Sequence, residues 1–247
     1  MVLFDDVSVH DTASEPRRPA QTLEPAVPAI NRTVHGDVEA TPRRRGAQAR
    51  KRMLDLLVAS LALIPAIPIV VLAAVAIKAT SRGPVLFRQV RVGRNGAPVT
   101  VLKLRTMHCD AEAQLDADPA IRAEYVANGY KLPLGADPRI TRVGRLLRRT
   151  SLDELPQLFN VLRGDMSVVG PRPVLFEELE LYGDHMGAYL SVKPGITGRW
   201  QTEGRDGIGY PLRAELDAEY ARTWSTRTDC MILLRTAKVV LLARGVE

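Results

Sequence analysis

The 247-residue sequence has few cysteines and histidines, and neither type is arranged as a metal site or a disulfide framework. Cys109 and Cys230 are far apart, and the four histidines lack the spacing of zinc ligands. This pattern argues against a disulfide-stapled secreted domain and against a structural zinc module. We therefore expect the folded part to lie in a reducing compartment.

Aromatic residues are also scarce, at 5% of the chain, whereas the formal net charge is +6. The positive charge predicts an anionic partner, which is a nucleic acid, an acidic lipid or a phosphorylated small molecule. Grooves that bind single-stranded nucleic acid stack bases on aromatic side chains, so the shortage of aromatics argues against that class. The apolar content of 46% is ordinary for a folded protein.

Residues 1–48 lack helical or strand periodicity and are rich in Pro, Ala, Thr, Glu and Arg. We expect this segment to be a disordered tail. Asp5 and Asp6 stand close to the start, and no apolar core follows in roughly the next 30 residues. The segment therefore does not have the pattern of a secretory signal.

One long apolar run is present, LLVASLALIPAIPIVVLAAVAI, from Leu56 to Ile77. Its roughly 22 uncharged residues are enough to cross the hydrocarbon core of a bilayer. Pro65 and Pro68 lie mid-run, where each removes a backbone hydrogen bond and disfavours helical geometry in the residue before it. We expect a sharp break there. Asp55 is expected to stay at the membrane interface and to pair with Arg52.

Basic residues flank the apolar run on both sides. They are Arg43, Arg44, Arg45, Arg50, Lys51 and Arg52 before it, and Lys78, Arg82, Arg88, Arg91 and Arg94 after it. Because Lys and Arg mark the cytoplasmic side of a membrane segment, both ends are predicted to be cytoplasmic. A helix–break–helix hairpin that dips into one leaflet satisfies this pattern. A true span and a buried soluble helix remain alternatives.

After Gly83 the pattern changes to short strands and helices. Residues 85–90 and 99–104 are predicted strands joined by a turn at Asn95-Gly96. Residues 109–130 look helical and acidic, and residues 138–149 form a basic amphipathic segment. The alternative for the latter is a solvated helix face over buried Val143, Leu146 and Leu147. The C-terminal stretch CMILLRTAKVVLLARG fits a helix on the membrane or an ordinary core helix.

Two acids stand side by side in TSLDELPQLFNVLRGDMSVVGPRP, residues 150–173. Ser151-Leu152-Asp153-Glu154 matches an S-x-x-E capping box, in which Ser151 caps a helix and Glu154 reaches back to it. The local pattern leaves this structural interpretation open. The alternative is that Asp153 and Glu154 serve one site, which adjacent helical positions can do only at an exposed helix start.

Arginines surround this pair in the flanking helix and in two loops rich in Gly and Pro. Such turns expose backbone N–H groups beside cations and form anion sites, and a guanidinium grips phosphate with two hydrogen bonds. We predict the phosphate holders Arg105, Arg148, Arg172 and Arg205. A carboxylate at a helix N-terminus near arginines has its ionised form favoured, so it can act as a metal ligand or a nucleophile.

The ordered motifs closely resemble one family. KRMLD precedes the proline-containing run, and GPVLFRQVRVG, KLRTM, DPRITRVGRLLRRTSLDELPQLFNVLRGDMS, VGPRP and KPGITG-x-WQ follow in unbroken order. From about Arg50 to Gly245 the sequence is similar to the bacterial sugar transferases that initiate glycan assembly, the monotopic polyprenyl-phosphate phosphoglycosyltransferases. The insertion from Asp110 to Asp137 resembles the exopolysaccharide-initiating branch.

The resemblance implies transfer of a phosphosugar from a UDP-sugar to a polyprenyl phosphate such as undecaprenyl phosphate, with release of UMP and with Mg²⁺ as cofactor. It implies that Asp153 forms a covalent phosphosugar intermediate and binds the metal, and that Glu154 assists the acceptor phosphate or the metal. Lys103 and Arg105 are weaker matches among the phosphate-binding positions. The implied location is the cytoplasmic face of the bacterial inner membrane, with lipid as a partner and no nucleic acid. The oligomeric state stays open.

The sequence departs from the family pattern at two places. Ile64 precedes Pro65 where the family often has serine, and a second proline follows at Pro68. Arg199 precedes Trp200 where an apolar residue is common. Arg199 either alters sugar preference or is a quiet surface substitution.

Together these patterns predict a helix-rich α+β fold in three parts. Residues 1–48 are the tail, residues 49–80 the basic flank and re-entrant membrane helix, and residues 81–247 a cytoplasmic catalytic domain with a small β-hairpin and interfacial amphipathic helices. A basic membrane-associated adaptor that keeps the fold without the chemistry is the alternative. The presence of both Asp153 and Glu154 argues against it.

Overall fold

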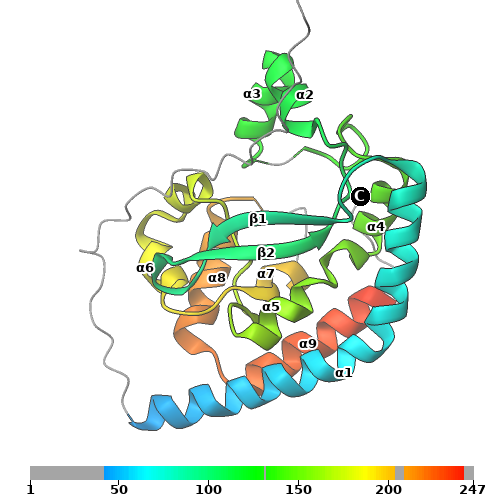
Figure 1. The fold of residues 1–247 in the computed structure, drawn as a ribbon. Coiled ribbons are helices and arrows are strands. Elements are labelled where there is room, and N and C mark those ends of the chain that lie inside the picture. The colour runs from blue at the N-terminus through cyan, green and yellow to red at the C-terminus, as the bar shows by residue number, and fades with distance from the viewer. Residues whose placement is uncertain (1–41, 131, 204–208, 242–247) are drawn as a thin grey trace, which may run out of the picture.

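The chain folds into a helix-rich α+β structure, as the sequence predicts (Figure 1). A computed structural model describes residues 42–130, 132–203 and 209–241. Its α-helices are α1 (Pro42–Thr80), α2 (Ala111–Ala117), α3 (Pro119–Ala127), α4 (Arg142–Arg149), α5 (Gln157–Arg163), α6 (Met186–Leu190), α7 (Arg199–Glu203), α8 (Leu212–Thr223) and α9 (Thr226–Leu241). Its 3-10 helices are η2 (Arg94–Gly96), η3 (Leu152–Glu154) and η4 (Glu177–His185), and its strands are β1 (Leu86–Val92), β2 (Pro98–Leu104), β3 (Ser167–Val169) and β4 (Gly195–Thr197).

Helix α1 is 39 residues long and contains the whole apolar run. It is long and apolar enough to cross a membrane, and only 17% of its most apolar window is buried against the rest of the protein. Leu61, Ile64 and Leu72 are among its exposed side chains, at 59%, 70% and 72% exposure. An uncovered apolar face of this kind is typical of a membrane-associated segment, and it disfavours the alternative of a buried soluble helix.

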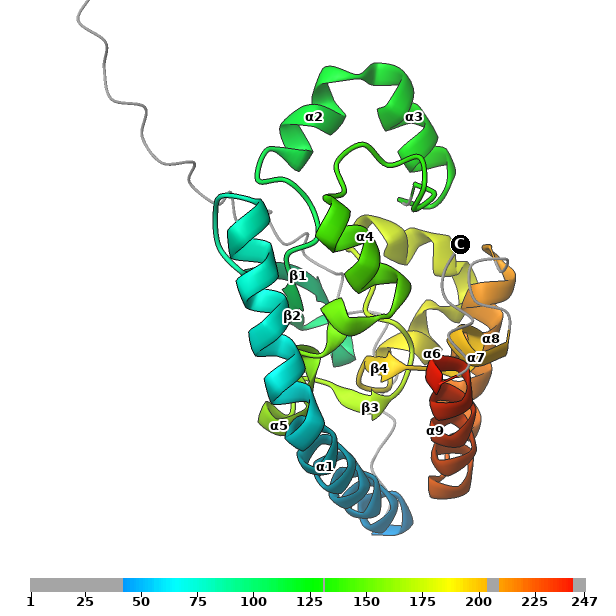
Figure 2. The same ribbon diagram turned by 90° about the vertical axis from the view of Figure 1, so that its right-hand side faces the viewer.

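The two prolines bend α1 but do not end it, which differs from the predicted break. The helix is assigned without interruption through Pro65 and Pro68, and its ribbon curves along its length (Figures 1 and 2). Each proline lacks an N–H, so the carbonyls four residues earlier, at Leu61 and Ile64, lose their helical donors. Such a loss kinks a helix without necessarily stopping it. A single bent helix therefore stands where the sequence predicts a helix–break–helix hairpin.

The predicted β-hairpin is confirmed. Strands β1 and β2 are antiparallel, with a register that runs from Leu86 opposite Leu104 to Val92 opposite Pro98. The turn lies at the predicted Asn95-Gly96, where both residues have positive φ, at 57° and 73°. Asn and Gly are the residues that adopt this conformation most readily.

A second, parallel pair of strands was not predicted from the sequence. Strand β3 pairs with β4 so that Ser167 lies opposite Gly195 and Val169 opposite Thr197. The backbones continue in close contact beyond the strands, because a Cβ added at Gly195 would come within 2.1 Å of the Gly170 backbone nitrogen. The two loops rich in Gly and Pro are therefore held against each other, and only glycine fits at this crossing.

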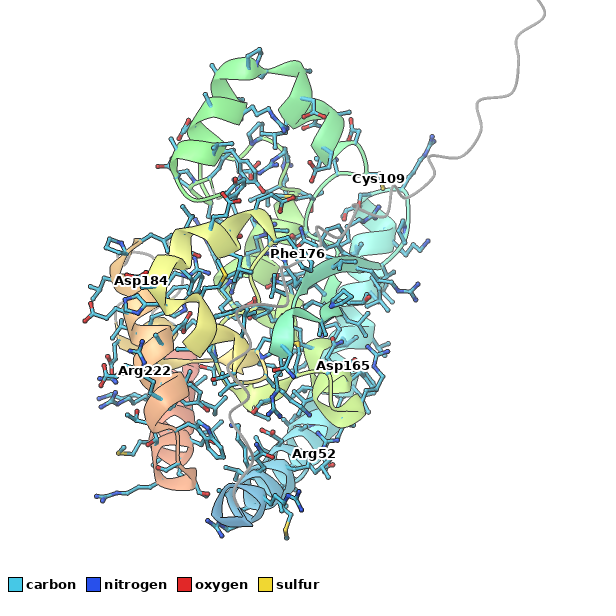
Figure 3. All side chains as sticks on the ribbon, turned by 90° about the vertical axis from the view of Figure 1, so that its left-hand side faces the viewer. Arg52, Cys109, Asp165, Phe176, Asp184 and Arg222 are labelled. Carbon is cyan, nitrogen blue, oxygen red and sulfur yellow. The ribbon has the colours of Figure 1, made fainter. Side chains whose placement is uncertain are left out.

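The N-terminal part of α1 is fixed to the rest of the protein by polar contacts. Lys51 donates to the Val169 carbonyl at 2.9 Å and forms an ion pair with Asp229 of α9 at 2.8 Å. Arg52 donates to the last carbonyls of α5, at Val161 and Leu162, and Figure 3 shows Arg52 below the end of α5.

Asp55 is almost fully buried, and its Oδ1 accepts hydrogen bonds from the Ser167 hydroxyl at 2.8 Å and the Val168 N–H at 2.9 Å. The predicted pairing of Asp55 with Arg52 is wrong. Arg52 instead donates to carbonyls of α5, and Asp55 accepts from a hydroxyl and an N–H of β3.

The acidic helical segment is confirmed and forms a lobe that projects from the body (Figures 1 and 2). Helices α2 and α3 make up the lobe, and an isolated bridge between Met107 and Ile140 closes its base. A buried ion pair between Asp137 and Arg139 stabilises the return segment, with Nε and Oδ1 2.8 Å apart.

Helix α4 has the amphipathic character that the sequence predicts. Val143 and Leu147 pack on Ala73 and Ile77 of α1. Leu146 was expected to be buried in the solvated-helix interpretation, but it is 61% exposed. Because the same helix carries exposed arginines, its outer face combines one large apolar side chain with positive charge.

Helix α9 combines features of both predicted alternatives. Ile232 is buried in the main core, whereas Leu234 is 73% exposed and Met231 44%. One side of α9 is therefore an ordinary core face, and the other leaves apolar side chains uncovered.

Candidate active site

A small pocket opens between the β-hairpin, the start of α5 and the two loops that β3 and β4 hold together. The residues that line it are Arg91, Val101, Lys103, Glu154, Gln157, Arg172, Pro173, Gly195 and Ile196. In the antiparallel register, Arg91, Val101 and Lys103 occupy the same face of the hairpin, because each side chain points the same way as its cross-strand partner. The hairpin thus supplies two cations to one wall of the pocket.

The two predicted acids lie on the 3-10 turn η3, between α4 and α5. Ser151 precedes the turn in the left-handed region, with φ 56° and ψ 17°, and its side chain makes no capping hydrogen bond. The predicted capping box is therefore wrong. Asp153 is only 7% exposed, so the predicted exposed helix start is also wrong. The adjacent acids can still serve one site because the tight turn, rather than a regular helix, carries both of them.

Glu154 is held by two of the cations. Its Oε1 accepts from the Lys103 ammonium at 3.0 Å and from the Arg172 guanidinium at 3.2 Å. Burial alone would raise the pKa of Glu154, but Lys103 and Arg172 together outweigh it and lower the pKa to about 2. The Glu154 carboxylate is therefore ionised throughout the physiological pH range.

The pKa of Asp153 is shifted in the opposite direction. Burial and the negative charge of Glu154 raise its pKa to about 6, against the attraction of Lys103, Arg148 and Arg172. The predicted preference for the ionised form is thus wrong for Asp153 and right for Glu154. A carboxylate that is ionised at neutral pH yet more basic than an ordinary aspartate is suited to act as a nucleophile.

Three of the four predicted phosphate holders lie among the described residues, and the structure separates them. Arg172 lines the pocket. Arg148 donates from Nε to the Thr106 hydroxyl at 2.9 Å, and its charge acts on Asp153. Arg205 lies outside the described residues.

Arg105 is engaged elsewhere. One of its terminal nitrogens, Nη2, donates to the Ser81 carbonyl at 3.0 Å and to the Ser81 hydroxyl at 2.8 Å, and the other contacts the Arg82 carbonyl. Its guanidinium thus ties the loop after α1 to strand β2, and this gives no support to a phosphate-binding role.

The structure adds Arg91, Lys103 and Gln157 to the site. Sequence reasoning treated Lys103 as a weak match and Arg91 only as part of a basic flank. The signal that identifies them is alternation along the hairpin, where basic residues at odd-numbered positions share one face. Arg91 is tied to the buried Glu178 at 3.3 Å, which fixes its position beside the pocket.

Arg172 is presented by a rigid loop. The hydroxyl of Tyr189 donates to the Arg172 carbonyl at 3.2 Å, and the Gly195 N–H donates to the Pro171 carbonyl at 2.7 Å. Arg199, the unusual residue before Trp200, pairs with Glu203 and Glu219 instead of facing the pocket. These pairs favour the surface interpretation of Arg199.

Among the described residues, no group of three or more His, Cys, Asp or Glu side chains is arranged to hold a metal ion. Glu154 lines the pocket and has one oxygen already committed to Lys103 and Arg172, and the buried Asp153 lies next to it on η3, behind the lining residues. Mg²⁺ commonly takes only one or two protein carboxylates and completes its shell with water and substrate phosphates. The donor set therefore fits a magnesium ion that arrives with a phosphorylated substrate.

The sequence is similar to a family of bacterial proteins and to several individual members of known name. The family model described as "Bacterial sugar transferase" matches residues 46–243. The chain is 43% identical over 206 residues to an undecaprenyl-phosphate galactose phosphotransferase of Salmonella typhimurium, which covers 82% of this chain but only 42% of that protein. It is 42% identical over 199 residues to the exopolysaccharide production protein ExoY of Rhizobium meliloti, which covers 79% of this chain and 87% of that protein.

A third relative is the UDP-glucose:undecaprenyl-phosphate glucose-1-phosphate transferase of Caulobacter vibrioides. It is 43% identical over 206 residues, which cover 80% of this chain and 72% of that protein. The chain therefore spans most of two of these relatives and about four-tenths of the Salmonella protein.

Proposed function

This chain belongs to the bacterial sugar transferase family, and on that premise we propose that it transfers a sugar 1-phosphate from a UDP-sugar to undecaprenyl phosphate and releases UMP. Two relatives are named for undecaprenyl phosphate as the acceptor, and the name of one of them includes a UDP-linked donor. The product would be the first lipid-linked intermediate of an exopolysaccharide or another surface glycan. The enzyme would act on the cytoplasmic face of the bacterial inner membrane.

One observation carries the proposal: Asp153, a buried aspartate with a raised pKa, directly precedes Glu154, which two cations hold in the pocket. Lys103 and Arg172 are 3.0 and 3.2 Å from Glu154, and Arg91 lines the same wall. The lining holds three cations and one carboxylate, and it stays net positive when the Glu178 partner of Arg91 is counted, which suits the anionic diphosphate of a nucleotide sugar. An adaptor without catalytic activity has no need for this arrangement.

In the proposed first step, a carboxylate oxygen of Asp153 attacks the phosphorus that carries the sugar. The P–O bond to the other phosphate breaks, its electron pair leaves with UMP, and an acyl phosphate joins Asp153 to the phosphosugar. In the second step, an oxygen of the lipid phosphate attacks the same phosphorus, and the bond to Asp153 breaks. Both nucleophiles are anions, so neither step needs a base to remove a proton from them.

Lys103, Arg172 and Arg148 would stabilise the negative charge that collects on the phosphoryl oxygens. Glu154 holds Lys103 and Arg172 in place before substrate binds, and it keeps the pKa of Asp153 high. Asp153 and Glu154 would hold Mg²⁺ together with the substrate phosphates, and the ion would neutralise the diphosphate. The acceptor phosphate would reach the pocket from the membrane surface that α1 defines.

For α1 we propose re-entrant insertion, in which the bent helix enters one leaflet and both ends stay on the cytoplasmic side. The basic flanks support this topology because both ends carry Lys and Arg in similar density. The backbone carbonyls that Pro65 and Pro68 leave free would be costly in lipid, which favours a shallow position near the interface.

The proposal is tested by measuring nucleotide release from purified protein in nanodiscs with undecaprenyl phosphate, Mg²⁺ and a panel of UDP-sugars. We expect continuous UMP release from one donor to require the lipid, release without lipid to stop at one UMP per protein, and both to be lost in Asp153→Asn. Release of UDP would indicate ordinary glycosyl transfer. If folded, membrane-bound protein releases no nucleotide with any donor, the adaptor function replaces this proposal.

A further inference from the structure

Ser151 has an unusual backbone conformation two residues before Asp153. Three non-glycine residues among those described have positive φ, namely Asn95, Tyr130 and Ser151. Asn95 lies in the hairpin turn, where this conformation is expected. Ser151 lies at the junction between α4 and η3, with φ 56° and ψ 17°. For an L-residue other than Gly or Asn, this region is disfavoured by roughly fivefold to thirtyfold.

The conformation joins two helical turns that run in different directions. The Ser151 N–H donates to the Arg148 carbonyl at 3.1 Å and closes the end of α4, while the Ser151 carbonyl accepts from the Glu154 N–H at 3.3 Å and starts η3. If Ser151 had right-handed helical φ and ψ, α4 would continue past it, and the Asp153 side chain would point in a different direction from the one it has now. The left-handed link instead buries Asp153 where the charge of Arg148 acts on it.

Apolar packing holds the helical turns on both sides of Ser151 in place. Leu147 of α4 and Leu152 of η3 belong to the same apolar cluster, which also holds Ala73 and Ile77 of α1. The two helical turns are therefore anchored on a common core, and the backbone between them is the part that sets their relative direction. A residue that resists positive φ would strain this link or turn Asp153 away.

The Ser151 hydroxyl does not account for the left-handed conformation, since it makes no capping hydrogen bond to the turn that follows. We propose that Ser151 is a positioning residue whose left-handed backbone holds Asp153 in its buried position on η3, next to Glu154 of the pocket. This inference rests on the proposed function, because positioning matters only if Asp153 is the nucleophile.

Substitutions at Ser151 should change kcat in a definite order. Gly adopts positive φ freely, Ala does so with strain, and the β-branched Val is the most resistant. The kcat should therefore follow the order Ser151→Gly at least equal to wild type, then Ser151→Ala, then Ser151→Val. We expect Val to lie about fivefold to thirtyfold below Gly, the ratio that the backbone preference implies. The KM for the UDP-sugar should stay unchanged, since the phosphate-binding cations are not altered.

Asn95 provides a matched control. Asn95→Val imposes the same backbone conflict in the hairpin turn, outside the site. It should lower the melting temperature by a similar amount to Ser151→Val and leave kcat unchanged. A fall in kcat for both variants would show that the effect is general destabilisation, and it would overturn the inference.

The experiment measures kcat and KM of UMP release together with the melting temperature in wild type, Ser151→Gly, Ser151→Ala, Ser151→Val and Asn95→Val. We expect the ordered kcat at constant KM for the Ser151 variants and the wild-type kcat for Asn95→Val. Equal losses in Gly and Ala would mean that the hydroxyl acts, and equal kcat in Gly and Val would mean that the conformation does not position Asp153; either result overturns the inference while UMP release by the wild type leaves the proposed function standing. If the wild type releases no UMP with any donor, the proposed function fails and this inference fails with it.

Discussion

At the scale of single residues, the site depends on two adjacent carboxyl groups with different surroundings. Glu154 has two cationic partners within hydrogen-bonding distance, whereas the side chain of Asp153 makes no hydrogen bond to the residues that the structure describes, and burial raises its pKa. Their pKa values of about 2 and about 6 follow from this difference. Separation of pKa values in a neighbouring pair is the usual means by which an active site assigns different roles to identical groups.

The raised pKa of Asp153 predicts the pH dependence of intermediate formation. The nucleophile must be ionised, so the rate should rise with pH and reach half its maximum near pH 6. Glu154→Gln removes a negative charge that raises this pKa, so its half-maximum should move to lower pH. The test is single-turnover UMP release as a function of pH, without lipid. A shift to higher pH in Glu154→Gln would contradict the electrostatic account.

The same burial predicts that Asp153 reduces stability at neutral pH. The folded-state pKa of about 6 lies above the ordinary aspartate pKa of 3.8, so folding favours the protonated form. Its contribution to stability is complete below about pH 3.8 and is lost as pH rises through about 6. Asp153→Asn should therefore raise the free energy of unfolding by about 1–3 kcal/mol at neutral pH and abolish activity.

Thermal unfolding in one detergent at two pH values tests this effect. The melting temperature of Asp153→Asn should exceed that of wild type at neutral pH, and the gain should shrink toward pH 4 as the wild-type carboxyl becomes protonated. A lower melting temperature of the variant at neutral pH would show that Asp153 stabilises the fold.

The sequence could identify the acids and two of the arginines, but not all of their neighbours. Asp153, Glu154, Arg148 and Arg172 lie within one stretch, so short-range pattern is enough to group them. Lys103 lies 51 positions before Glu154, and only the hairpin register brings it to the pocket. The left-handed conformation of Ser151 could not be predicted, because Ser151-Leu152-Asp153-Glu154 also matches a capping box. The packing of Leu152 with Leu147, which local sequence does not reveal, favours the left-handed turn.

At the scale of elements, local signals predicted the β-hairpin well and α1 only in part. The hairpin has a specific turn sequence, Asn95-Gly96, between two strands of matching length. The prolines of α1 predict a local loss of hydrogen bonds, but the long flanking helical segments continue across it. Strands β3 and β4 are three residues each and pair with a distant segment, so periodicity could not reveal them.

Asp55 joins α1 to β3, and this contact gives a prediction about the anchor. Asp55→Ala would leave the Ser167 hydroxyl and the Val168 N–H without their acceptor in a buried place. We expect a loss of about 2–4 kcal/mol in the free energy of unfolding, with a smaller loss for Asp55→Asn, which keeps one acceptor oxygen.

Ser167→Ala is the matched control, because it removes one donor and leaves no buried donor unpaired. Its cost should be about 1 kcal/mol, measured by thermal or denaturant unfolding in the same detergent. If Asp55→Ala were no more destabilising than Ser167→Ala, the docking of α1 would depend on its apolar contacts and not on this carboxylate.

At the scale of the whole molecule, apolar and basic surfaces occur together. Helix α1 leaves most of its apolar side chains exposed, and Leu146 and Leu234 add further exposed apolar positions on α4 and α9. Arginines accompany them on α4. Such a combination suits a protein that binds an anionic membrane surface and draws a lipid phosphate into a cationic pocket.

The re-entrant topology predicts that both ends of α1 face the cytoplasm. Arg50 and Arg82 are exposed on either side of the apolar run, and Arg50→Cys and Arg82→Cys can be placed singly in a chain with Cys109→Ser and Cys230→Ser. An impermeant maleimide applied to intact spheroplasts should label neither thiol, and both should react after permeabilisation. Labelling of one of the two in intact spheroplasts would establish a full membrane span.

The proposed mechanism requires a covalent phosphosugar on Asp153, which intact-protein mass spectrometry can detect. The protein would be incubated with the active UDP-sugar and Mg²⁺ in the absence of lipid, and then acid-quenched. The account predicts a mass increase of one phosphosugar in wild type, none in Asp153→Asn, and disappearance of the increase when undecaprenyl phosphate is added. An enzyme that releases UMP only when lipid is present and never gains this mass would contradict the account, because the phosphosugar would then pass directly from donor to acceptor.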